Sequence, residues 1–273
     1  MGKFNIKRFW LTFKWFFYEN RGHIVKWTLG IMLATTLLQM CLVGIITHTT
    51  TEIEGIPQNS SPYQMAVMMV NSICTVIVVL GVLFVNSNVF GMLKQKQKRI
   101  AFLTLPATNL ERWTVAILFA VIIIPACIVA GYALGDLLRN IVYYIQGHEW
   151  VWGFNTFFSK VGPQLGFTTE MLQDAIALWS ISIYVLAGTW FTKGQFVIAT
   201  GFQIVLTALL GYLANVFKNE IISILVNGIE AGQEDLIAYG VIAAVFALAL
   251  FNFWLSYRLF TRFQLITSKW TNV

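Results

Sequence analysis

The chain has 273 residues, of which 58% are hydrophobic and only 11% are charged. Ordinary soluble domains carry about 25% charged residues, so a soluble fold is excluded because its interior would be too small for this much apolar surface. The net charge of +6 is carried by residues that lie between long apolar stretches, which indicates membrane topology rather than nucleic-acid binding.

The first 22 residues predict an amphipathic helix that lies on the membrane surface. Segment 3–20 is too short and too charged to cross a bilayer. On a helix, however, its aromatic residues recur at the i, i+3, i+4 and i+7 spacing of one face, with Lys7 and Lys14 on the flank. The helix is expected on the inner leaflet, as a simple anchor or as a lever on the first span. Its apolar face comprises Phe9, Trp10, Phe13, Phe16 and Phe17.

Six stretches are long and apolar enough to cross a bilayer, which takes about 20 residues. Region 23–260 is therefore expected to form the six-helix transmembrane domain of an all-α membrane protein, followed by a cytoplasmic tail at 261–273. The predicted spans are 27–47, 64–92, 113–135, 172–191, 196–217 and 236–257.

The positions of Lys and Arg orient these spans. The N-terminus, loop 93–112, the link 192–195 and the C-terminal tail, with Lys26 and Arg258 at span edges, hold 15 of the 18 basic residues. Among the acids they hold only Glu19 and Glu111. Lys and Arg concentrate on the cytoplasmic side of membrane proteins, so both termini are predicted to be cytoplasmic.

The loop after the second span combines basic and apolar residues. Pro106 ends this part, and Thr108 followed by Glu111 predicts a capping box at the start of the next helix. Apolar residues on a cytoplasmic loop need a cover of lipid or of a partner protein. The basic residues are Lys94, Lys96, Lys98 and Arg99, and the apolar ones that follow are Ile100, Phe102, Leu103 and Leu105.

Catalytic chemistry has no support in this sequence. There is no GxxxxGK[ST] phosphate-binding loop, and the histidines, His23, His48 and His148, lie at or outside the ends of the predicted spans. Neither a catalytic residue nor a metal ligand set is therefore predicted, and the chain is not expected to be an enzyme. The span centres also lack ionisable residues, since Asp136 and Asp174 lie toward span ends, which disfavours an ion-coupled carrier without eliminating it.

Other features within the spans concern helix packing. Pro125 is expected to kink the third span, and Gly131 with Gly135 forms a GxxxG contact motif. Neutral polar residues either line a substrate path or form interhelical hydrogen bonds. They are Gln39, Asn71, Asn86, Asn88, Gln203, Asn215 and Asn252.

Taken together, the N-terminal helix, six spans with both ends inside, the tight link 192–195 and loop 93–112 resemble an ABC transporter permease of the type-two exporter class. The segment FLTLPATNLERW resembles the LP-containing start of the third span in that family. There, the loop after the second span forms a coupling helix that docks on a separate nucleotide-binding ATPase subunit. The resemblance implies that 94–105 has this role, that ATP and Mg are bound by the partner and no cofactor by this chain, and that outer helices occupy about 218–233.

The expected function is therefore the membrane-spanning permease subunit of an ATP-driven exporter in the bacterial inner (cytoplasmic) membrane. Its expected partners are the ATPase subunit, a second permease copy in a homo- or heterodimer, and lipid. Two alternatives stay open: an ion-coupled carrier or channel, and a non-transporting membrane scaffold subunit. The sequence favours an amphiphilic or lipid-like substrate only mildly over a polysaccharide or an ion.

Overall fold

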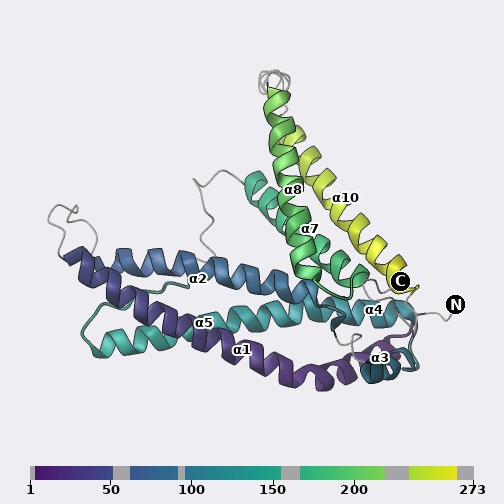
Figure 1. Cartoon of the computed structure of the whole chain (residues 1–273), viewed down its shortest axis with the longest axis horizontal. Coiled ribbons are helices and arrows are strands. Elements are labelled where there is room, and N and C mark those ends of the chain that lie inside the picture. Colours follow the sequence, from purple (N-terminus) through teal and green to yellow (C-terminus); the bar gives the residue numbers. More distant parts are fainter. Residues whose placement is uncertain (1–3, 52–61, 92–95, 155–166, 219–233, 263–273) are drawn as a thin grey trace. The chain divides into compact units, whose positions relative to one another are not determined.

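The computed structural model describes residues 4–51, 62–91, 96–154, 167–218 and 234–262 (Figure 1). Helices make up most of these residues, and no β-strand occurs among them. In chain order the helices are α1 (Ile6–Thr51), α2 (Pro62–Ser87), α3 (Lys96–Leu103), α4 (Asn109–Leu118), a π-helical turn at Phe119–Ile123, α5 (Ile124–Ile145), α7 (Phe167–Trp190), α8 (Gln195–Val216) and α10 (Glu234–Phe260).

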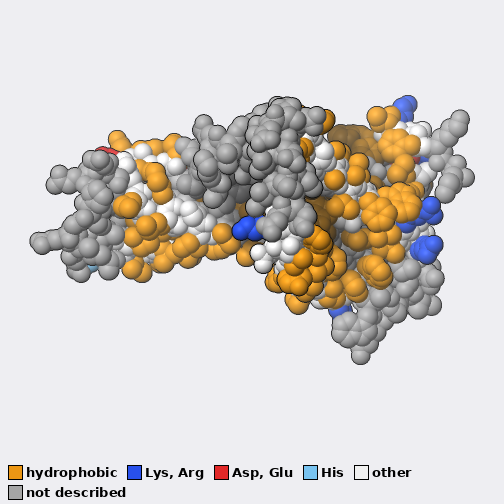
Figure 2. Space-filling model, turned by 90° about the horizontal axis from the view of Figure 1, so that it is seen from above, with side chains coloured by type: hydrophobic (Ala, Val, Ile, Leu, Met, Phe, Trp, Pro, Cys, Tyr) orange, Lys and Arg blue, Asp and Glu red, His pale blue; other side chains and the backbone are white. Residues whose placement is uncertain are grey.

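Six helical stretches are long and apolar enough to cross a membrane, which confirms the predicted all-α membrane fold. Hydrophobic side chains cover much of the described surface in Figure 2, with few charged ones among them, as expected for helices that face lipid. Which side each terminus occupies stays a prediction. The six stretches are Ile6–His48, Tyr63–Ser87, Asn109–Ile145, Glu170–Trp190, Gln195–Leu213 and Leu236–Phe260.

The N-terminal helix does not end where the sequence predicted. Helix α1 runs without interruption from Ile6 to Thr51, so the boundary expected after residue 22 is not a helix boundary. Gly22 costs a helix only about 1 kcal/mol relative to Ala, and a Cβ there would meet nothing within 4 Å. Without a proline, the Arg21–His23 triplet gives the helix no reason to stop. Placement of residues 1–22 on the membrane surface stays a prediction.

Contacts group the chain into two compact units. Unit 1 comprises Met1–Phe13, Leu83–Val121 and Gly162–Val273, and unit 2 comprises Lys14–Val82 and Ile122–Val161. In unit 2, fully buried apolar side chains of α1, α2 and α5 form the core: Val43, Val67, Val70, Cys74, Val78 and Ile128.

Close contact between α1 and α5 in unit 2 depends on the GxxxG motif. A Cβ at Gly131 would lie 2.5 Å from the Thr28 carbonyl oxygen, and one at Gly135 would overlap the Thr35 hydroxyl. The backbones therefore approach more closely than any larger residue permits. The hydroxyl of Thr36 also donates to the Gly135 carbonyl at 3.3 Å. The predicted GxxxG contact is confirmed.

In unit 1, α7 packs against both α8 and α10, and α10 also contacts α4. Polar side chains join these helices: Asn252 donates to Ser182 at 2.9 Å, and Trp113 donates to Ser256 at 3.2 Å. Asn252 therefore forms an interhelical hydrogen bond, one of the two roles that the sequence left open. At Gly188, a Cβ would overlap the Ser87 carbonyl, so α7 passes closely by the end of α2.

The irregularity expected at Pro125 takes the form of a π-helical turn. This turn, Phe119–Ile123, separates α4 from α5, and Pro125 follows within the first turn of α5. Proline has no N–H to donate to the preceding turn and its ring crowds the carbonyl there. A wider π turn relieves that conflict without ending the helix.

Candidate functional site

The segment predicted to dock on a partner forms a separate helix, α3, of 8 residues between the second and third long helices. Among its side chains, Ile100 is 42% exposed and Lys98 and Arg99 are half-buried. Leu105, in the turn that follows, is also half-buried. Lys94 and the side chains of Lys96 and Leu103 lie outside what the structure describes.

Phe102, one of the predicted partner contacts, has a fully buried side chain in this structure. Its ring meets Phe260 edge-on at 6.2 Å, and Phe260 stacks on Phe90 at 5.2 Å. Phe260 is the last residue of α10, so Phe102 anchors α3 to the C-terminal end of the last span. Among the described side chains of α3, Ile100 is the exposed large apolar one.

The capping box predicted at the start of α4 is present. The Glu111 carboxylate accepts from the Thr108 backbone N–H at 2.8 Å, and the Glu111 N–H donates to the Thr108 hydroxyl at 3.3 Å. Arg112 adds a further link across the turn, because its guanidinium donates to the Leu105 carbonyl at 2.7 Å. The turn after α3 is thus fastened to α4 on both sides of Pro106.

Glu111 also holds the N-terminal end of α1, which sequence reasoning missed. Its side chain is fully buried, and its Oε1 accepts from the Asn5 backbone N–H at 2.7 Å and from the Arg8 guanidinium at 3.2 Å. Asn5 in turn caps α1, since its side chain accepts from the Lys7 N–H at 2.9 Å. The carboxylate thus lies at the positive ends of two helices, where a negative charge is stabilised. We call Asn5, Arg8, Thr108 and Glu111 the Glu111 clamp.

The aromatic residues of the predicted interfacial face divide into two groups. Trp10 and Phe17 are exposed, by 53% and 42%. Phe16 is only 4% exposed, Phe9 is half-buried, and the Phe13 ring lies 5.2 Å from that of Phe119. Phe16 is thus buried by protein next to Thr12, and Phe13 contacts Phe119. Contact of this face with lipid stays a prediction.

In unit 2 the structure reveals a buried ion pair between Asp136 and Arg139, one turn apart on α5. Both side chains are fully buried, with Nη2 and Oδ1 2.7 Å apart. The Arg139 guanidinium also donates to the Tyr63 hydroxyl at 2.9 Å and to the Val151 carbonyl at 2.6 Å. The second Asp136 oxygen accepts from the Phe154 N–H at 2.9 Å. Such pairing and hydrogen bonding compensate both charges, as a buried ion pair requires.

The connection after α5 is fastened over this pair. Asn140 accepts from the Val151 N–H at 3.2 Å, and the space a Cβ would need at Gly153 is filled by the amide of Asn71. Asn71 accepts in turn from Gln39 at 2.7 Å and from Tyr132 at 2.9 Å. We call Tyr63, Asp136, Arg139, Asn140 and the backbone of 151–154 the α5 clamp. Its bonds are directed within the chain, so its role here is to hold one connection in place.

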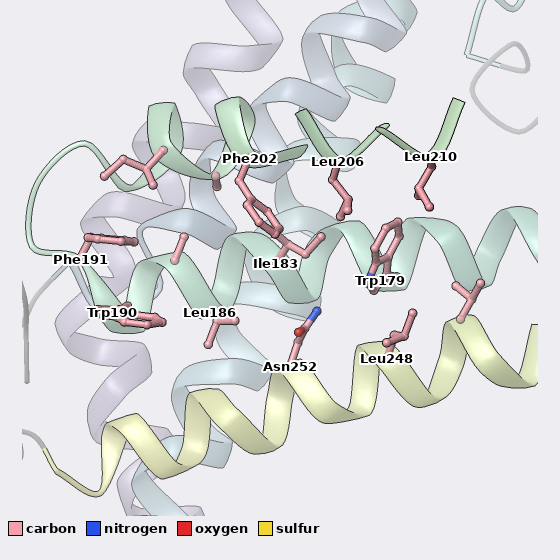
Figure 3. Close-up of a pocket in the computed structure, with 14 residues that line it drawn as sticks. Trp179, Ile183, Leu186, Trp190, Phe191, Phe202, Leu206, Leu210, Leu248 and Asn252 are labelled. Atoms are coloured by element: carbon pink, nitrogen blue, oxygen red, sulfur yellow. The ribbon is translucent and has the colours of Figure 1, made fainter. Parts of the chain in front are cut away.

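A hollow of about 670 Å³ lies in unit 1 between α7, α8 and α10 (Figure 3). Its lining is apolar and aromatic apart from Asn252, whose amide already donates to Ser182. The space suits a hydrocarbon group and offers no arrangement of acids, bases or nucleophiles. It is lined by Trp179, Ile183, Leu186, Ala187, Trp190, Phe191, Ile198, Ala199, Phe202, Leu206, Leu210, Val245, Leu248 and Asn252.

Within the described part of the chain, no three His, Cys, Asp or Glu side chains are grouped as metal ligands would be. Comparison with protein family models, with curated proteins and with solved structures found no match. The class defined by the fold is therefore an all-α membrane protein with six candidate spans.

Proposed function

We propose that the chain is the membrane-spanning permease subunit of an ATP-driven ABC exporter, coupled to a separate ATPase subunit through α3. ATP and Mg would be bound by that partner, and a second permease copy would complete the transporter in a bacterial cytoplasmic membrane. The observation that carries this proposal is a short basic helix between the second and third apolar helices, anchored to the last one through Phe102 and Phe260.

A coupling element must be tied rigidly to the helices it moves, and α3 has such ties. Phe102 contacts Phe260 at the end of α10, and α10 packs along α7. On the other side, the carbonyl of Leu105 accepts from Arg112 of α4. The Glu111 clamp joins α4 to the start of α1. A displacement of α3 would therefore reach α1, α4, α7 and α10 through these contacts.

The proposed docking surface of α3 combines basic residues with an exposed apolar residue. Ile100 is 42% exposed, and Lys98 and Arg99 precede it on the same short helix. A partner surface with an apolar pocket and acidic residues around it would complement this face, and desolvated apolar anchors of this kind supply much of the binding energy of protein interfaces.

The proposal is tested by co-expressing the chain with a candidate ATPase and measuring how much ATPase co-purifies. Ile100→Asp is expected to abolish recovery of the complex, because a carboxylate would be buried without a partner. Leu110→Asp is the matched control, since Leu110 is 41% exposed but lies on α4. Equal recovery of the ATPase by both variants and by the wild type would contradict docking through α3.

The competing functions make a different prediction for the chain alone. An ion-coupled carrier or channel would transport in liposomes under an ion gradient without any ATPase. A scaffold subunit would neither transport in liposomes nor bind an ATPase subunit. It would co-purify with membrane proteins that bind no nucleotide.

A further inference from the structure

We propose that the hollow between α7, α8 and α10 binds an acyl chain of one anionic phospholipid, whose headgroup lies at the end near Lys193 and Arg258. This inference does not rest on the proposed function. The hollow, of about 670 Å³, is within the range of roughly 300–1,000 Å³ typical of ligand sites. Because its lining is aliphatic and aromatic apart from Asn252, whose amide already donates to Ser182, the hollow suits a hydrocarbon occupant.

The length of the hollow fits one leaflet of a bilayer. Along α7 its lining runs from Trp179 to Trp190, a rise of about 16 Å at 1.5 Å per residue. A leaflet is half of a hydrocarbon core about 30 Å thick, which gives about 15 Å. Figure 3 shows Trp190 and Phe191 at one end of the hollow and Leu210 and Trp179 toward the other.

Cations mark the Trp190 end of the hollow. The Thr189 hydroxyl donates to Ser256 at 3.3 Å, so the last turns of α7 and α10 lie side by side. Exposed Lys193 follows α7, and exposed Arg258 lies in the last turn of α10, with its guanidinium 5.0 Å from the Trp254 ring centroid. Both cations thus lie at the same level along α7 and α10 as the Trp190 end of the hollow, where they would attract a phosphate.

Among the described residues of α7, α8 and α10, no acidic residue lies at the same end. The described residues 195–216 and 236–262 contain no Asp or Glu, and the acids of α7, Glu170 and Asp174, precede Trp179 near its N-terminal end. The charge pattern therefore favours an anionic over a zwitterionic headgroup at the Trp190 end.

A second copy of the chain fits this surface less well than a lipid. Two copies in one membrane share the same orientation, so a two-fold dimer through this face would bring Lys193 and Arg258 close to the same residues of the other copy. Like charges brought together oppose that contact, whereas a lipid phosphate neutralises them.

The test is native mass spectrometry of the purified chain after titration with phosphatidylglycerol or phosphatidylcholine of identical acyl chains. Leu248→Trp fills the hollow, and Leu250→Trp is its control, because the two leucines are 51% and 53% exposed but only Leu248 lines the hollow. We expect Leu248→Trp to lose the tightly bound lipid and Leu250→Trp to retain it at the wild-type level.

A second pair of variants, on α8, provides an independent test in case the α10 variants misfold. Leu210 lines the hollow and Leu209 does not, at 50% and 51% exposure, so Leu210→Trp should lose lipid and Leu209→Trp should not. Lys193→Gln should keep the bound chain but lower the preference for phosphatidylglycerol about fivefold, as expected for one interfacial cation.

Equal lipid retention by the hollow-filling variants and their controls would overturn the proposal. So would a wild-type chain that binds no lipid and forms a dimer that Leu248→Trp dissociates, because a second copy would then be the occupant.

Discussion

At the scale of single residues, the Glu111 side chain joins the start of α1 to the start of α4. Part of its role follows from local sequence, because Thr108 and Glu111 have the spacing of a capping box. Its bonds to Asn5 and Arg8 join residues more than 100 positions apart. No local pattern signals a contact of that kind, since only the tertiary fold brings the start of α1 to the start of α4.

We predict that Glu111→Ala lowers the free energy of unfolding by about 3 kcal/mol, because two partly buried backbone N–H groups lose a charged acceptor at the starts of two helices. Arg8→Ala should cost less than about 1 kcal/mol, since the Arg8 side chain is 40% exposed and its pairing is screened by solvent. Thermal or denaturant unfolding in detergent measures both. Equal decreases in the free energy of unfolding for the two variants would mean that the ion pair, rather than the hydrogen bonds to backbone N–H groups, supplies the stability of the Glu111 clamp.

The α5 clamp predicts a strong dependence of each charge on the other. Arg139→Ala should destabilise the protein by about 3–5 kcal/mol, because Asp136 would stay buried without its counter-ion. The double variant Asp136→Asn with Arg139→Gln should cost less than Arg139→Ala, since no unpaired charge is left. The same unfolding measurements decide this, and a double variant at least as destabilised as Arg139→Ala would show that the ion pair is not the source of the stability.

The sequence predicts only part of the geometry of this ion pair. The spacing of Asp136 and Arg139 on one helix face is visible in the sequence. Their burial is not, because it depends on the connection 151–154 folding back over them through backbone groups of Val151 and Phe154.

At the scale of helices, apolar length and period predicted the six spans, while the ends of helices were harder to place. The third helical stretch extends to Ile145 rather than 135, because Asp136, Arg139 and Asn140, which interrupt the apolar run, are buried by protein and do not end the helix. Similarly, α1 continues through Gly22, since a hydropathy boundary is not a helix terminus unless a cap or a proline marks it.

The contact between α1 and α5 gives a prediction at this scale. Gly131→Ala should lower stability by about 1–3 kcal/mol, because its Cβ would lie 2.5 Å from the Thr28 carbonyl of the facing backbone. Gly30→Ala is the matched control on α1, where a Cβ would meet nothing within 4 Å. It should be neutral or stabilising by up to about 1 kcal/mol. Melting temperatures of the two variants compare them directly, and equal changes would argue against close packing at the GxxxG motif.

At the scale of the whole molecule, orientation in the membrane was predicted from charge alone. Thr261→Cys should react with a membrane-impermeant thiol reagent only after the cells are opened, because the C-terminus is predicted to be cytoplasmic. Gln146→Cys, exposed after α5, should react in intact cells. The reverse pattern of labelling would invert the topology and place α3 outside, where no ATPase could reach it.

The proposed function of the whole molecule requires that α3 binds an ATPase subunit, and site-specific crosslinking measures this contact. In a background with Cys41, Cys74 and Cys127 replaced by alanine, Ile100→Cys and Leu110→Cys are each treated with a short thiol-to-amine crosslinker in membranes that contain the candidate ATPase. We expect a covalent crosslink between the two chains for Ile100→Cys and none for Leu110→Cys. Absence of the product at Ile100→Cys, in membranes where the ATPase is bound, would contradict coupling through α3.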